Sequence, residues 1–398
     1  MLSNDAYRTL RSSVDEDFLS VQAAVELARS LKDDLIFDAL LEAALESKIR
    51  GKGRTVSVSK NVFIPLTNLC RDRCAYCTFS KTPDSAEAKT YTLSEVASVA
   101  EGGRKTGCIE ALFCLGDKPE VAYRSHREWL SKRGYETTTD HLIAGCETAF
   151  EVGLLPHTNA GILTAEEMEA LRPTNASMGL MLENISPRLR EKGMPHQYAP
   201  DKDPEIRLRM HREAGELKIP FTSGVLIGIG EDENERAQTI AAIRELSDRY
   251  GHIQEVIIQP FHPKPDTPMR FVSTLEFKEI AGWIAISRLM LGSRANLQAP
   301  PNLAPEVLEL LLRAGVSDWG GVSPVTVDFI NPEAPWPVLK DLQDRTEQAG
   351  QELVFRLPVY PDHIARPEFF ETAMLERIKA FAGPDGYAKK EGPEQETA

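Results

Sequence analysis

Residues 61–80 read NVFIPLTNLCRDRCAYCTFS and join an apolar, β-branched run directly to a loop with three cysteines. Together with the residues before it, the run VSVSKNVFIPLT is typical of a buried β-strand. Cys70, Cys74 and Cys77 follow within eight positions and are half of the six cysteines in the chain. In a compartment that keeps thiols reduced, such a group indicates metal binding or catalysis. The stretch therefore predicts a strand that ends in a metal-binding loop.

Beyond this loop, strand and helix patterns alternate along the chain. Helix starts are indicated by capping pairs such as Thr92 with Glu95 and Ser273 with Glu276. The further strands that we expect are CIEALFCLG, LLPHTNAG, ASMGLMLE, PFTSGVLIGIG, IQEVIIQP, ANLQAP and GVSDWG. This alternation predicts an α/β fold: a parallel β/α barrel of the TIM-like kind, whole or partial.

The pattern divides the chain into four segments. Residues 1–54 are expected to be helical, with two helices over 14–50. The barrel is expected over 55–335, and a C-terminal helical extension over 336–383. The tail, 384–398, is polar and contains Gly and Pro, so we expect it to be disordered.

Composition restricts the class of partner. The 398 residues include 60 acidic and 46 basic ones, a net charge of −14, which argues against nucleic acid and against an anionic membrane surface. No apolar run approaches the roughly 20 residues that cross a bilayer. The amino terminus lacks the apolar region of a signal peptide. We therefore expect a cytoplasmic protein with a small-molecule substrate.

The spacing of the three cysteines is C-x3-C-x2-C, and no second knuckle of cysteines lies nearby. Structural zinc sites use four protein ligands, and this loop offers three, so a zinc site is the less favoured interpretation. Cys108, Cys114 and Cys146 lie singly in or beside apolar segments and are expected to be small buried side chains. A cubane iron–sulfur cluster held by three thiolates would leave one iron open to an amine and a carboxylate.

The sequence C-x3-C-x-aromatic-C after a first strand resembles the signature of the radical S-adenosylmethionine (SAM) superfamily. The resemblance implies a [4Fe–4S] cluster with Cys70, Cys74 and Cys77 as its ligands. It also implies that SAM binds the fourth iron and is cleaved to a 5′-deoxyadenosyl radical. A chance loop of three cysteines and a zinc site are the alternatives.

Further positions resemble the SAM-binding motifs of this superfamily. The glycine-rich motif after the second strand corresponds to GDKPE at 116–120, which departs from the commoner GGE, and the adenine-side motif to Gly224-x-Leu226-x-Gly228-x-x-Glu231. A dinucleotide fingerprint is the alternative for the latter, but its third glycine is absent. The resemblance implies that SAM contacts Tyr76, Gly116, Asp117, Lys118, Pro119, Asn159, Glu183, Arg207, Leu226, Gly228 and Glu231. Surface or capping roles compete for Asn159, Glu183 and Arg207, and a purely structural role for Tyr76.

A narrower resemblance covers about residues 60–340. The segments ALFCLGDKPE, LPHTNAGILT, SMGLMLENISPRL, HQYAPDKDP and IPFTSGVLIGIGE, with the cysteine loop, resemble the first-subunit radical enzyme of 7,8-didemethyl-8-hydroxy-5-deazariboflavin synthase. The resemblance implies a separate second subunit that joins the 4-hydroxybenzyl group of tyrosine to 5-amino-6-ribitylaminouracil. It implies that this chain cyclises the resulting 5-amino-5-(4-hydroxybenzyl)-6-(ribitylimino)-dihydrouracil adduct and releases ammonia, as a carbon–nitrogen lyase. A reductant such as flavodoxin or ferredoxin would supply the electron. The chain is too short for two barrels, so we expect the stand-alone form.

Polar residues at the expected carboxyl ends of the later strands are candidates for substrate contact, because active sites of such barrels lie at that rim. They are Gln259, His262, Gln298, Asn302 and Asp318, with His262 and Asp318 as candidates for catalytic proton transfer. The alternatives are another radical SAM enzyme of the same branch, such as the second synthase subunit or an aminofutalosine, hydrogenase-maturation or biotin-synthase-like enzyme. A non-catalytic iron–sulfur carrier, a zinc scaffold and an ordinary barrel hydrolase or aldolase are others.

Overall fold

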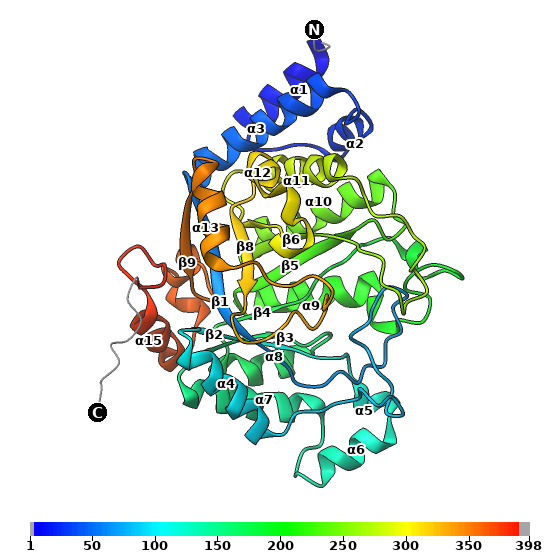
Figure 1. The fold of residues 1–398 in the computed structure, drawn as a ribbon, viewed down its shortest axis with the longest axis vertical. Helices are drawn as coiled ribbons and strands as arrows, with labels where there is room; N and C mark the ends of the chain where they lie inside the picture. Colours follow the sequence, from blue (N-terminus) through cyan, green and yellow to red (C-terminus); the bar gives the residue numbers. More distant parts are fainter. Residues whose placement is uncertain (1–3, 390–398) are drawn as a thin grey trace.

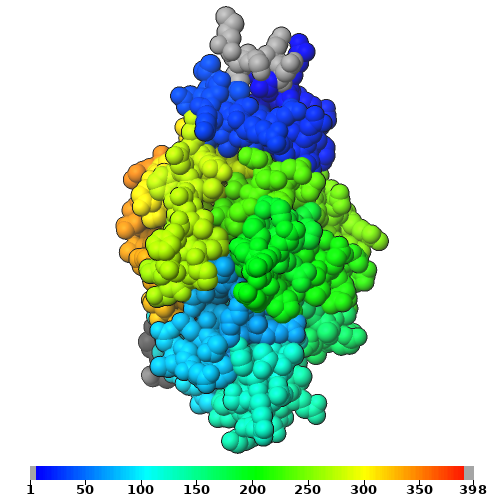
Figure 2. Space-filling view, turned by 90° about the vertical axis from the view of Figure 1, so that its right-hand side faces the viewer, coloured from blue at the N-terminus to red at the C-terminus, as the bar shows by residue number. Residues whose placement is uncertain are grey.

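The computed structural model describes residues 4–389. The molecule is elongated, with the N-terminal helices at one end and the segment around residues 124–131 at the other (Figures 1 and 2). Three helices cap the first end: α1 (Asn4–Asp15), α2 (Val21–Arg29) and α3 (Asp34–Lys52). Two of them, α2 and α3, are the two helices expected over 14–50, and α1 precedes them. The side chains of Ser20 and Asp33 accept hydrogen bonds from backbone N–H groups at the starts of α2 and α3.

Eight parallel strands form a closed barrel, which confirms the expected fold. The sheet runs in sequence order from β2 to β8, and β1 pairs with both β8 and β2. The strands are β1 (Thr55–Pro65), β2 (Glu110–Cys114), β3 (Leu155–Asn159), β4 (Ser177–Gly179), β5 (Phe221–Ile227), β6 (Ile253–Pro260), β7 (Leu297–Gln298) and β8 (Asp318–Val322).

Helices surround the barrel in the order that the alternation predicts (Figure 1). Thr92 and Glu95 form the predicted capping box. The helix expected to start at Ser273 instead begins at Phe277 with Glu276 as its N-cap. The helices after α3 are α4 (Leu93–Lys105), α5 (Pro119–Ala122), α6 (Arg124–Ser131), α7 (Thr138–Val152), α8 (Ala165–Leu171), α9 (Pro204–Glu216), α10 (Glu233–Tyr250), α11 (Phe277–Leu291), α12 (Leu308–Arg313), α13 (Leu339–Gln348), α14 (Pro361–Ile364) and α15 (Thr372–Phe381).

The C-terminal segment is not wholly helical, in contrast to the expectation. Between α13 and α14 the chain forms β9 (Glu352–Arg356), which pairs in parallel with Thr55–Ser59 of β1. Residues 383–389 are ordered as well, since Ala388 donates a backbone hydrogen bond to the Phe355 carbonyl (2.9 Å). The rest of the tail that we expected to be disordered, 390–398, lies outside the described residues.

The apolar core lies between the strands and the helices. Leu40 and Leu41 of α3 are fully buried in the same cluster as Trp283 and Ile284 of α11, so the N-terminal helices are part of the folded unit. A second cluster lies between the strands and helices α4 and α7. Within residues 4–389, no helix has the length and apolarity needed to span a membrane.

Candidate active site

The cysteine loop follows β1, and backbone hydrogen bonds from three distant segments hold it. Arg71 donates to the Asp117 carbonyl (2.9 Å), and Ala75 donates to the Pro195 carbonyl (2.9 Å). The N–H of Met269 donates to the carbonyl of Ala75 (3.2 Å). Because these bonds come from the segments after β2, β4 and β6, the loop has a fixed position at the carboxyl ends of the strands.

Gly116 shows how closely the loop approaches β2. A Cβ at this position would lie 2.0 Å from the backbone oxygen of Leu69 and 2.7 Å from the Cβ of Cys70. The backbone N–H of Gly116 also donates to the Thr67 carbonyl (2.9 Å). The glycine is therefore required by contact with the backbone of the cysteine loop.

The three thiols line one cavity of about 280 Å³ and are all free. The Asp117 N–H donates to the Cys70 Sγ (3.1 Å), and the Ser80 N–H donates to the Cys77 Sγ (3.4 Å). Burial raises the pKa of the Cys70 thiol to about 12. A thiol in this environment is deprotonated when a metal cation binds it, so the three sulfur atoms fit as ligands of an iron–sulfur cluster.

The structure brings most of the expected site residues to this cavity. Besides the cysteines, its walls include Tyr76, Gly116, Asp117, Asn159, Glu183, Arg207, Leu226, Gln259 and His262. The remaining expected residues do not line it: Lys118, Pro119, Gly228, Glu231, Gln298, Asn302 and Asp318.

Asp318 is the clearest correction. It is the first residue of β8 and pairs in register with Ser57, near the start of β1. The residue therefore lies at the amino end of the barrel, opposite the cysteine loop. There it forms an ion pair with Arg356 of β9, with Nε and Oδ2 2.7 Å apart. Its assignment to the rim was wrong because the strand begins, rather than ends, at this residue.

Glu231 and Lys118 have partners away from the cavity. The carboxylate of Glu231 accepts hydrogen bonds from the N–H groups of Gly228 (2.7 Å) and Ile229 (2.8 Å) and pairs with Arg236. Glu231 therefore shapes its own loop. Lys118 forms an ion pair with Glu167 of α8.

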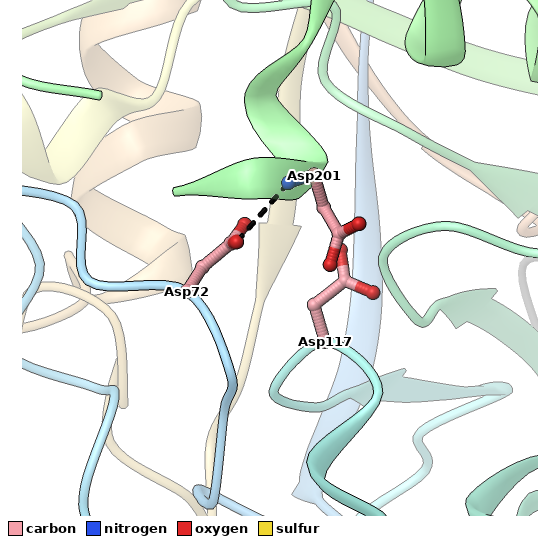
Figure 3. A group of neighbouring side chains, drawn as sticks. All are labelled: Asp72, Asp117 and Asp201. Carbon is pink, nitrogen blue, oxygen red and sulfur yellow. Dashed lines mark hydrogen bonds between the residues drawn. The ribbon is translucent and has the colours of Figure 1, made fainter. Parts of the chain in front are cut away.

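Three aspartates converge beside the cysteine loop, as Figure 3 shows for Asp72, Asp117 and Asp201. The Asp201 N–H donates to the Asp72 Oδ1 (3.1 Å), and Arg71 forms an ion pair with the Asp201 carboxylate. Burial, followed by the charges of Asp201 and Asp72, raises the pKa of Asp117 to about 8. Asp72 and Asp117 also line the cavity, so this wall suits a cationic group such as an ammonium.

Positively charged side chains lie near Glu183. The backbone of this residue has a positive φ of 63°. Burial opposes its ionisation, but the charges of Lys202 and Arg207 outweigh burial and lower the pKa of the carboxyl. The Arg207 Nε donates to the Met181 carbonyl (2.9 Å), and the Tyr76 hydroxyl lies 2.9 Å from the His196 Nε2. The wall thus offers a buried carboxylate that pairs with Lys202 and is stabilised by the charge of Arg207.

Several polar cavity residues were not expected from the sequence, among them Asp72, Cys114, Lys202 and Lys264. Cys114 ends β2 and reaches the cavity, although we expected a buried core side chain. Lys202 lies in the quoted segment HQYAPDKDP, so a signal was present. Lys264 lies in a proline-rich loop, FHPKPDTP, where a turn was the natural interpretation.

Comparison with known proteins agrees with this geometry. The family model "Radical SAM superfamily" matches residues 64–243. A 7,8-didemethyl-8-hydroxy-5-deazariboflavin synthase from Methanopyrus kandleri is 45% identical over 335 residues, which cover 84% of this chain and 100% of the relative. An FO synthase from Streptomyces avermitilis is 42% identical, but this chain, covered to 96%, spans only 46% of that relative.

Two solved structures share the fold. A maturase of the [FeFe]-hydrogenase has a TM-score of 0.72 at 15% identity, with 89% of this chain and 76% of that chain covered. Methylornithine synthase has a TM-score of 0.69 at 16% identity, with 87% and 97% covered. The sequence relatives and the family model show that the chain belongs to the 7,8-didemethyl-8-hydroxy-5-deazariboflavin synthase family of the radical SAM superfamily.

Proposed function

We propose that this chain is the radical enzyme that forms the deazaflavin 7,8-didemethyl-8-hydroxy-5-deazariboflavin. The observation that carries the proposal is the group of three free thiols at one cavity wall, in a chain 45% identical to a deazariboflavin synthase along that relative's whole length. When bound, the [4Fe–4S] cluster and SAM that the superfamily uses supply a 5′-deoxyadenosyl radical.

In this proposal Cys70, Cys74 and Cys77 are the three cluster ligands, which leaves one iron for SAM. The buried carboxyl groups of Asp117 and Asp72 face the cavity and are suited to an ammonium group. Arg207 would orient a carboxylate, although two backbone carbonyls already accept hydrogen bonds from its guanidinium.

For the remainder of SAM we propose Asn159 and Glu183 as partners of the ribose hydroxyls. Leu226 and Tyr76 would provide apolar and aromatic contact to the adenine. All four residues line the cavity, at the ends of different strands or in the cysteine loop. A wall built from several rigid strands holds a reactive carbon radical away from most C–H bonds.

The substrate in the proposal is the dihydrouracil adduct of tyrosine and 5-amino-6-ribitylaminouracil, which cyclises with release of ammonia. His262 is our candidate for the proton transfer. It lines the cavity, and its buried Nε2 has no hydrogen-bond partner within the described part of the chain. Burial lowers the pKa of His262, so the imidazole is neutral near pH 7 and can accept a proton.

The second synthase subunit would supply the adduct, and a flavodoxin or ferredoxin the electron, in the cytoplasm. The test is an anaerobic assay of the reconstituted protein with the second subunit, tyrosine, the uracil, SAM and a reductant. We expect deazaflavin fluorescence and one 5′-deoxyadenosine for each deazaflavin formed. Formation of 5′-deoxyadenosine without deazaflavin would assign the chain to another radical SAM reaction, and absence of both would indicate a non-catalytic carrier.

A further inference from the structure

A second cavity, of about 620 Å³, adjoins the cavity of the cysteine loop. Phe79 and Lys264 line both cavities and therefore form the wall between them. The outer cavity is completed by residues just after the cysteines, such as Thr78, and by residues after β8, such as Phe329. Because Phe79 is two positions from Cys77, a molecule that crosses the wall would have one part beside the cysteine loop and another part outside it.

The charges of the outer cavity are balanced. Its walls contain three lysines, at 81, 89 and 264, and three acids, at 87, 266 and 333. Lys81 forms an ion pair with Glu87, and the Lys89 ammonium lies 3.2 Å from a carboxylate oxygen of Glu95. The Lys264 ammonium lies 3.9 Å from a Glu333 carboxylate oxygen. With each cation beside an acid, the cavity does not favour a phosphate and suits a neutral polar group.

Hydrogen-bonding capacity remains at the wall. Lys264 is 6% exposed and donates to the Ile330 carbonyl, but an ammonium has three N–H donors. Thr78 also lines the outer cavity, and its buried hydroxyl has no partner among residues 4–389. Hydroxyl groups of a ligand can both donate and accept, so they match a mixture of ammonium, carboxylate and hydroxyl groups.

We propose that the outer cavity binds a neutral, polyhydroxylated chain of the substrate, while the reacting rings lie beside the cysteine loop, and that Lys264 positions the chain at the wall. The inference rests on the proposed function, because that function provides a substrate with a ribityl chain. The inference adds where the ribityl chain of the substrate binds, and it adds that the site prefers a substrate whose ribityl chain carries no phosphate.

The experiment compares wild-type and Lys264→Met enzyme, both reconstituted with cluster, on the adduct and on an analogue with an n-pentyl group in place of the ribityl chain. We expect the pentyl analogue to lower kcat/KM of the wild type at least tenfold. Lys264→Met should lower kcat/KM for the ribityl adduct about tenfold and leave that for the pentyl analogue within twofold. The control is Lys278→Met. In the wild type the Lys278 ammonium pairs with Asp34 on the N-terminal helices.

An equal loss on both substrates would overturn the proposal, because Lys264 would then act only by holding the Ile330 carbonyl. Equal turnover of an adduct with a 5′-phosphorylated chain would overturn the preference. If Lys264→Met unfolds, Thr78→Val replaces it, since it removes a buried hydroxyl that has no partner among residues 4–389 and keeps the shape. That variant should lose activity, severalfold, on the ribityl adduct alone.

Binding separates this inference from the proposed function. Equilibrium dialysis of the reconstituted protein with 5-amino-6-ribitylaminouracil needs no turnover. If Lys264→Met weakens binding about tenfold, the result supports the site for the ribityl chain. This holds even if the wild type forms no deazaflavin, which is the result that would contradict the proposed function. A Kd that Lys264→Met leaves unchanged overturns the chain site even if deazaflavin is formed.

Discussion

Arg356 of β9 places its guanidinium against the carboxylate of Asp318 at the start of β8, and both side chains are buried. A second guanidinium nitrogen of Arg356 lies 2.9 Å from the Glu255 carboxylate. One cation therefore forms ion pairs with two buried carboxylates. The hydroxyl of Tyr360 donates to Glu255 as well (2.9 Å). The network joins the C-terminal segment to the amino end of the barrel.

Removal of this cation should strongly destabilise the protein. Arg356→Met leaves two buried carboxylates without their charge partner, and we expect a loss of about 3–5 kcal/mol in the free energy of unfolding. The matched control is Arg313→Met, which breaks an exposed pair with Asp38 and should cost less than about 1 kcal/mol. Urea denaturation of both variants tests the difference, and similar small losses would contradict it.

The cysteines should separate into ligands and core residues. Cys74→Ala should abolish SAM cleavage, because two thiolates cannot hold the cluster, and the anaerobically reconstituted variant should contain little iron and sulfide. Cys146 is fully buried in the apolar core, so Cys146→Ala should keep iron, sulfide and activity with a modest loss of stability. Cleavage of SAM at the wild-type rate by Cys74→Ala would end the radical assignment.

Gly116 should tolerate no side chain. In Gly116→Ala the new methyl group meets the Leu69 carbonyl oxygen, so the cysteine loop must move and cluster content should fall. A Cβ added at Gly102 in α4 would have no neighbouring atom within 4 Å, and Gly102→Ala should stabilise the helix by about 0.5–1 kcal/mol. Iron content and thermal midpoint test this pair; normal cluster content in Gly116→Ala would show that the loop is free to shift.

Stability should fall in mild acid. Burial lowers the pKa of seven histidines to about 3 or 4, namely His126, His141, His157, His196, His211, His252 and His363. Between those values and the unfolded value near 6.5, the unfolded chain binds more protons than the folded chain. The contribution is therefore complete above pH 6.5 and is lost as the pH falls.

Each buried histidine contributes a slope of about 1.4 kcal/mol per pH unit in that window. Burial raises the pKa of Asp117 to about 8 and that of Glu255 to about 7, and these two carboxyls contribute slopes of opposite sign in this range. Unfolding free energies measured by urea between pH 5 and 7 should therefore fall toward acid by less than the sum of the histidine slopes. In His141→Leu the slope should decrease by the share of one histidine, while a variant with the wild-type slope would show that His141 is protonated in the folded state.

His262→Gln tests the proposed proton transfer. The change keeps a polar side chain but removes the group that exchanges a proton near neutral pH, so we expect deazaflavin formation to fall about 100-fold or more. Formation of 5′-deoxyadenosine should persist, because the cysteine loop and the SAM wall are untouched. Wild-type turnover by the variant would remove His262 from the mechanism.

The sequence predicted the barrel and the cysteine loop because both depend on local patterns. Strand and helix periods alternate visibly, and Cys70, Cys74 and Cys77 are close in the chain. The misplacement of Asp318 shows the limit: an error of a few residues in a five-residue strand moves a side chain from one end of the barrel to the other.

Other features depend on contacts that no local pattern encodes. ELVFR at 352–356 is a short run next to helical patterns, and pairing with β1 decides that it is a strand. Glu231 looked like a ligand contact, but its carboxylate binds backbone N–H groups of its own loop. No sequence pattern indicated a role for Lys264, because its hydrogen bond to the segment after β8 is a tertiary contact.

One edge of β1 pairs with two different strands, and this has a consequence for truncated chains. Its first half, Thr55–Ser59, lies against β9, whereas Asn61–Pro65 lies against β2. A version shortened before Glu352 would leave the first half with one row of bare amide and carbonyl groups. Such an open edge recruits strands from other molecules, so a shortened enzyme should form insoluble aggregates even though every cavity residue is still present.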